Sequence, residues 1–173
     1  MATKRDPLLH TVTTTAINPA LALLPAAMDS PSARVMLLAA GYQESKFRER
    51  LQRRGGPARG FWQFELGTQE RGGGVWGVYK HDSSRYWLDQ LCQARGCPFQ
   101  PRDIYTRIAE DDVLAAGLAR LLLFTDRQRL PALGDMQGAW ALYRYRTWCP
   151  GKPRPEEWPD SYGLAFDYVQ GVA

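Results

Sequence analysis

A glutamate at the end of an apolar stretch is the residue of this chain best suited to acid–base chemistry. Glu44 follows the mostly apolar run 35–42, and the aromatic pair Phe61 and Trp62 comes one loop later. Apolar surroundings penalise the charged form of a carboxyl group and raise its pKa. A carboxyl group that stays protonated near neutral pH can protonate a leaving oxygen, as cleavage of a glycosidic bond requires. The alternative is an ordinary surface ion pair between Glu44 and Arg48, one helical turn apart.

The two halves of this segment resemble a known signature. Residues 44–47 read Glu-Ser-Lys-Phe, a basic and Gly-rich loop follows, and residues 58–63 read Ala-Arg-Gly-Phe-Trp-Gln. From about Ser30 to Glu65 the sequence resembles lytic transglycosylases and goose-type lysozymes, with an aromatic pair where their signature carries Leu and Met. The resemblance implies a lysozyme-like fold and an enzyme that cleaves the MurNAc–GlcNAc bond in the glycan strands of peptidoglycan.

The resemblance also implies roles for individual residues of the segment. Glu44 would be the general acid, and in a transglycosylase the general base as well. Ser45 would orient that acid or a group of the substrate. Gln63 would hydrogen-bond the bound sugar, and Trp62 belongs to the aromatic strip that we expect to face it. Gln63 could instead satisfy backbone groups of its own loop.

Three further residues are candidates through the same resemblance. Goose-type lysozymes carry an acidic residue at the position of Glu65, which is taken to position the attacking water. A transglycosylase needs no such group, because a hydroxyl of the sugar itself attacks, so Glu65 favours hydrolysis unless it is simply a solvated side chain. The family also has a tyrosine, in the sequence Ala-Tyr-Asn, that contacts the acid. The nearest match is Tyr143, with Arg144 in place of Asn; Tyr145 is the other candidate, and Tyr143 could instead be core packing.

The elements that must position these residues are predicted to be mainly α. Ser30 is a capping residue and Pro31 fits a first helical position, so a helix starts there and carries Glu44 near its C-terminal end. Alternating apolar and polar residues are scarce, which allows at most a small β-hairpin near 60–80. Four further stretches have helical spacing or start signals: 83–92, 110–122, 135–147 and 159–169.

The length and composition suit a single domain. The chain has 173 residues, of which 45% are hydrophobic, enough for one sizeable core. Residues 1–16 are polar and Thr-rich and predict a flexible N-terminal arm. Residues 17–173 would then form the lysozyme-like catalytic domain, with 95–103 as a connector and 149–155 as a Pro-rich loop.

Charge and residue counts narrow the partners. A net charge of +4 favours anionic partners, among them the acidic bacterial wall. Nucleic-acid sites usually interleave aromatics among the cations, whereas here the aromatics follow the basic run 46–59, so no nucleic acid is expected. With two histidines and no Cys-x-x-Cys pair, we expect no metal and no cofactor. A Cys92–Cys97 bridge is sterically possible, but buried free thiols are the expectation.

The chain shows neither a good signal peptide nor a stretch that could span a membrane. We therefore expect synthesis in the cytoplasm and action on the cell wall, after release through a holin or as part of a phage particle. This makes a bacteriophage or prophage muralytic enzyme, either endolysin or virion protein, the leading hypothesis. The rival is a non-catalytic lysozyme-like component of a phage virion, structural or wall-binding, with other virion proteins as partners.

Overall fold

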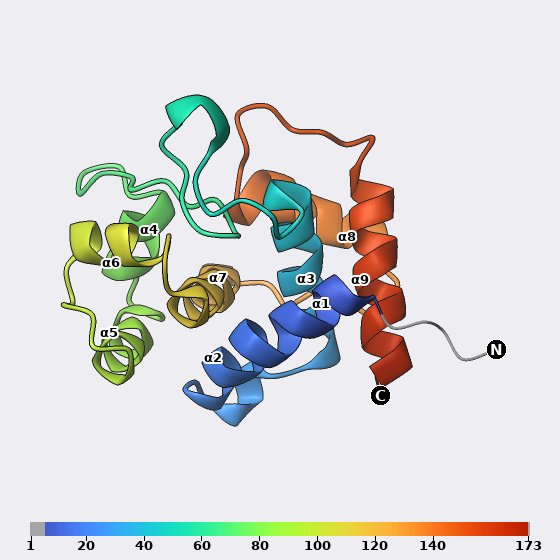
Figure 1. Cartoon of the computed structure of the whole chain (residues 1–173), viewed down its shortest axis with the longest axis horizontal. Helices are drawn as coiled ribbons and strands as arrows, with labels where there is room; N and C mark the ends of the chain where they lie inside the picture. Colours follow the sequence, from blue (N-terminus) through green and yellow to red (C-terminus); the bar gives the residue numbers. More distant parts are fainter. Residues whose placement is uncertain (1–5, 173) are drawn as a thin grey trace.

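Helix α3 (Pro31–Ser45) runs through the middle of the fold and carries Glu44 near its C-terminal end (Figure 1). A computed structural model of the chain describes residues 6–172, and helices predominate in them. The predicted mainly α class is therefore confirmed. Within the described residues the backbone forms isolated bridges but no sheet, and the region 60–80 holds only a tight pairing of Thr68 with Gly72 and a bridge from Phe64.

The start and end of α3 follow local signals. Ser30 Oγ accepts a hydrogen bond of 3.1 Å from the backbone N–H of Ala33, and Pro31 occupies the first helical position. The helix ends at Lys46, whose left-handed φ of 53° interrupts the helical path. Between these ends α3 is buried on most sides, and α9 (Trp158–Val172) packs along it.

The N-terminal segment is helical rather than flexible. It consists of three consecutive pieces, α1 (Pro7–Val12), the π-helix η1 (Thr13–Ile17) and α2 (Asn18–Ala22). Asp6 caps the start by accepting two backbone N–H groups, and the side chains of Leu9 and Val12 are buried in the core. Threonine hydroxyls donate to carbonyls one turn back, which makes the Thr-rich run compatible with a helix. The predicted arm is therefore wrong for residues 6–16, while residues 1–5 lie outside the described part.

A second group of helices lies on the left in Figure 1, and its last helix packs against α3 and the N-terminal helices. It comprises α4 (Gly74–Lys80), α5 (Arg85–Ala94), α6 (Pro101–Arg107) and α7 (Asp112–Thr125). Helix α7 begins where its acidic run predicts, with the Asp111 carboxylate accepting the N–H of Leu114 at 3.0 Å. Helices α4 and α6 are not predicted from the sequence; α6 starts at Pro101, inside the expected connector 95–103.

The C-terminal third returns to α3. Helix α8 (Met136–Ala141) continues into the π-helix η4 (Leu142–Thr147), and a Pro-rich loop then leads to α9. The predicted helices near 135–147 and 159–169 are thus confirmed, with shifted ends. Two short 3-10 turns complete the fold, η2 (Ala26–Met28) and η3 (Arg53–Gly55). No helix within residues 6–172 combines the length and apolar character needed to cross a membrane.

All three cysteines are free thiols. Cys92 and Cys97 are buried at the end of α5 and just beyond it, as expected for small core residues. Cys149 is exposed in the Pro-rich loop, so the expectation of burial is wrong for this residue.

Candidate active site

Glu44 lies in the last turn of α3, where most of its side chain is withdrawn from solvent. Its Oε1 accepts a hydrogen bond of 2.6 Å from the hydroxyl of Tyr143, which comes from η4. No basic side chain within residues 6–172 forms an ion pair with this carboxyl group, and Arg48 is exposed to solvent. The surface-pair alternative for Glu44 therefore does not hold.

Burial controls the proton affinity of Glu44. It raises the pKa of this carboxyl group from the ordinary 4.5 to about 7, because the charged form loses its hydration. The hydrogen bond from Tyr143 and the positive charge of Arg154 act in the opposite direction, since both favour the carboxylate. A pKa near neutrality suits a group that must both give and take a proton.

A stack of aromatic rings fixes the Tyr143 hydroxyl. The Tyr143 ring lies between Trp158, at 5.0 Å between ring centroids, and Trp148, at 5.9 Å. The wide turn of η4 carries this residue, and π-helical turns recur at functional sites. Burial and the adjacent Glu44 raise the pKa of Tyr143, so its hydroxyl stays protonated and acts as a donor. Tyr143 is thus both a packing residue and the hydrogen-bond donor to Glu44.

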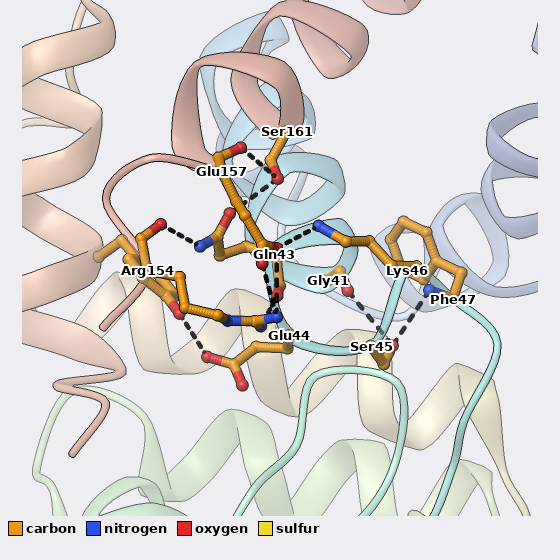
Figure 2. Close-up of polar contacts among 10 residues, drawn as sticks. Gly41, Gln43, Glu44, Ser45, Lys46, Phe47, Arg154, Glu157 and Ser161 are labelled. Carbon is orange, nitrogen blue, oxygen red and sulfur yellow. Dashed lines mark hydrogen bonds and ion pairs between the residues drawn. The ribbon is translucent and has the colours of Figure 1, made fainter. Parts of the chain in front are cut away.

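Ser45 ties the end of α3 to the loop that follows it. Its hydroxyl donates to the carbonyl of Phe61 at 2.7 Å and accepts the backbone N–H of Phe47 at 3.1 Å. These bonds hold the loop against the helix end, as Figure 2 shows for the contacts of Ser45 with Gly41 and Phe47. Ser45 therefore shapes the wall beside Glu44 and does not hydrogen-bond to the carboxyl group.

A cleft of about 1230 Å³ opens in front of Glu44. This volume exceeds the roughly 300–1,000 Å³ typical of sites for small molecules, and it suits an extended ligand. One wall comes from the end of α3 and the loops up to Glu65, and the other from the segment between Thr147 and Glu157. Tyr42 and Trp148, both partly exposed, present aromatic surface to the cleft.

Gln63 and Glu65 line the same cleft as Glu44, so the structure brings together these three predicted residues. The Gln63 side chain donates to the carbonyl of Gly60 at 2.9 Å, and its backbone has a left-handed φ of 50°. Gln63 therefore satisfies a backbone carbonyl of its own loop, which is the alternative to sugar binding. The residue nevertheless lines the cleft. Glu65 is exposed and opens to the cleft, where it can contact water.

Three predicted binding residues do not line the cleft: Tyr143, which is 2% exposed and contacts Glu44 from the protein side, Trp62 and Tyr145. Trp62 has 0% exposed surface, and its indole N–H donates to the carbonyl of Leu37 at 2.8 Å. A side chain without exposed surface cannot touch a substrate, so Trp62 supports the core beneath α3 instead. Tyr145 is 68% exposed but lies outside the cleft lining, because it points away from the side of η4 that carries Tyr143.

Three cations of the basic run 46–59 form ion pairs, whereas Arg48 and Arg54 are exposed. Lys46 pairs with Glu157 at 2.8 Å, and Arg50 pairs with Asp112 at 2.8 Å. Arg53 pairs with Glu49. The pairs of Lys46 and Arg50 join segments that are distant in the sequence, whereas the pair of Arg53 stays within the run.

Sequence reasoning missed Arg154 and the hydrogen bond made by Trp148, although the sequence makes Trp148 and the Pro-rich loop after it candidates for the wall of a sugar groove. Trp148 donates its indole N–H to the carbonyl of Trp62 at 2.9 Å and so closes the cleft wall beside Tyr143. Arg154 contacts the backbone of Gln43, the residue before Glu44. Neither the hydrogen bond from Trp148 to Trp62 nor the one from Arg154 to Gln43 has a local sequence signal. The two residues of each pair lie 86 and 111 positions apart in the sequence, respectively.

Comparisons with protein-family models, with curated proteins and with solved structures found no match to this chain. The role of the cleft therefore has to be inferred from its own residues.

Proposed function

We propose that this protein cleaves the glycan strands of peptidoglycan between MurNAc and GlcNAc, with Glu44 as the proton donor. The observation that carries the proposal is a partly buried carboxyl group with a pKa of about 7 that opens on a large cleft. The resemblance of residues 44–63 to lysozyme-like enzymes supports the same substrate class. We further propose that it acts on the wall as a phage endolysin or virion enzyme.

The reaction begins with transfer of the Glu44 proton to the glycosidic oxygen. The bond between this oxygen and the anomeric carbon breaks, and positive charge develops on the sugar ring. The Tyr143 hydroxyl, 2.6 Å from Glu44 Oε1, stabilises the carboxylate left behind. A nucleophile then attacks the anomeric carbon, and its proton passes to a carboxylate of the site.

Two nucleophiles fit this scheme, and they differ in the part played by Glu65. In a hydrolase, Glu65 accepts the proton of an attacking water. In a transglycosylase, the C6 hydroxyl of the same sugar attacks and its proton returns to Glu44, so no second carboxylate takes part. The exposed position of Glu65 on the cleft wall favours the hydrolase.

Digestion of purified sacculi with the full chain tests the proposal. Mass spectrometry of the soluble products would show glycan fragments, ending either in a reducing sugar or in a 1,6-anhydro sugar that lacks one water. Glu65→Gln abolishes hydrolytic products but leaves anhydro products unchanged. Failure of the parent protein to release any glycan fragment would contradict the proposal and favour the non-catalytic, wall-binding hypothesis.

A further inference from the structure

A reciprocal contact joins the Pro-rich loop to the residue beside Glu44. The Arg154 guanidinium donates to the backbone carbonyl of Gln43, and the Gln43 side chain donates to the backbone carbonyl of Arg154 at 3.0 Å. Ser161 of α9 completes the arrangement by donating to Gln43 Oε1 at 2.8 Å. Figure 2 shows this clamp of Gln43, Arg154 and Ser161 above Glu44. It fixes the loop against the last turn of α3.

The clamp provides hydrogen-bond partners for polar groups of Gln43 that would otherwise destabilise the fold. Gln43 is 1% exposed, and a buried amide without partners would lose about 1–3 kcal/mol. Its backbone carbonyl belongs to the last turn of α3, where carbonyls lack helical partners and a cation is favourable. Arg154 therefore occupies a site that the helix end provides, and its position is determined by the backbone.

The charges around Arg154 leave a positive excess next to Glu44. Glu157 pairs with Arg154 at 3.1 Å and with Lys46 at 2.8 Å, so one carboxylate is shared between two cations. The positive charge of Arg154 favours the ionised form of both Glu44 and Tyr143. Tyr143 contacts Glu44 from the protein side. The charged and titratable groups that line the cleft with Glu44 are Arg154, Lys46, Glu157, Glu49, Glu65, Arg53, Lys152, Asp160, Tyr42 and Cys149.

We propose that Arg154 is a positioning residue for Glu44: held by Gln43, its guanidinium stabilises the carboxylate that remains after Glu44 has given up its proton. The catalytic meaning of this assignment rests on the function proposed above. The electrostatic coupling itself does not, because it can be measured without a substrate. Without Arg154, only the Tyr143 hydrogen bond would oppose the effect of burial, so Glu44 would stay protonated to higher pH and would donate its proton to the glycosidic oxygen more slowly.

Titration of the Glu44 carboxyl carbon by NMR tests the coupling in the full chain, with the signal assigned by its loss in Glu44→Gln. In Arg154→Gln the midpoint rises above the parent value of about 7. Arg154→Lys keeps a cation and recovers most of the parent midpoint. Lys152→Gln is the matched control: it removes one cation from the same loop and the same cleft, and it leaves the midpoint unchanged.

Varying the salt concentration tests the coupling between Arg154 and Glu44 in the parent protein, without a variant. Because Arg154 is partly exposed, raising KCl from about 0.05 to 1 M weakens its effect, and the parent midpoint rises. An equal midpoint in Arg154→Gln and parent, an equal shift in Lys152→Gln, or a parent midpoint insensitive to salt would overturn the proposal. If the midpoint moves as expected while sacculi remain intact, the positioning role stands and the proposed function fails.

Discussion

The carboxyl group of Glu44 sits where its ionisation opposes folding. Its pKa is about 7 in the folded chain and about 4.5 when the chain is unfolded, so the folded state holds the proton more tightly. The contribution of Glu44 to stability is therefore greatest below pH 4.5, falls as the pH rises to about 7, and stays at the lower level above it. Active sites often lower the stability of the fold in this way, because the chemistry requires a group in an unfavourable environment.

Substitution of Glu44 by Gln should remove this cost. We expect Glu44→Gln to be more stable than the parent at pH 8, by up to about 3 kcal/mol, and to have no such advantage at pH 4. Urea unfolding at both pH values measures the difference. Glu70→Gln, an exposed glutamate of a surface turn, serves as the control. A stability gap for Glu44→Gln that is the same at both pH values would contradict the raised pKa.

The Tyr143 hydroxyl should lower the proton affinity of its partner. Tyr143→Phe keeps the ring in its stack but removes the donor to Glu44, so the Glu44 pKa should rise above 7. The alkaline limb of glycan cleavage, where the acid loses its proton, then moves to higher pH. Tyr145→Phe is a matched control two residues along the same π-helix, on an exposed side chain. Equal pH profiles for the two variants would count against the hydrogen bond.

At the scale of the elements, the local sequence around α3 predicts the helix that the structure contains. Its capping serine, its proline and its apolar run all predict the observed helix, and the acidic cap of α7 does the same for that helix. The Thr-rich N-terminus misled the prediction because threonine hydroxyls can bond to helix carbonyls as well as to water. The π-helical turn η4 has no sequence signature, since tertiary packing decides whether a helix takes up one extra residue.

Close packing under α3 depends on Gly41. A Cβ at this position would meet the Phe47 ring at 2.3 Å and the Trp62 indole nitrogen at 3.0 Å. Gly41→Ala should therefore destabilise the fold by about 1–3 kcal/mol, despite the better helix propensity of Ala. Thermal or urea unfolding measures this. Gly163→Ala in α9, where a Cβ meets nothing within 4 Å, should instead be neutral or stabilising. Equal effects of the two substitutions would show that the packing account is wrong.

At the scale of the whole molecule, the site joins segments that are far apart in the chain. Glu44, Gln63 and Glu65 come from one local stretch, where the apolar and aromatic neighbours indicate Glu44 and the family resemblance adds the other two. Tyr143 lies 99 positions from Glu44, and only a family resemblance points to it. Arg154 lies 111 positions from Gln43, and no local pattern marks it. The contact between the C-terminal Pro-rich loop and the end of α3 is therefore the part of the site that the sequence does not predict.

The N-terminal helices are part of the same body and should be required for its stability. Leu9 is 0% exposed, so Leu9→Ala should cost about 2–5 kcal/mol of folding free energy. Leu51→Ala, at a leucine that is 61% exposed, should change stability by less than about 0.5 kcal/mol. Denaturant unfolding of both variants distinguishes a packed segment from a flexible arm. A Leu9→Ala protein as stable as Leu51→Ala would indicate the arm.

The most direct test of the central claim is a zymogram on peptidoglycan with the parent protein beside Glu44→Gln. Both should fold, since the substitution removes a destabilising charge and keeps the shape of the side chain. The account predicts a cleared zone for the parent and none for Glu44→Gln. Equal clearing by both proteins would remove Glu44 from the chemistry and contradict the account.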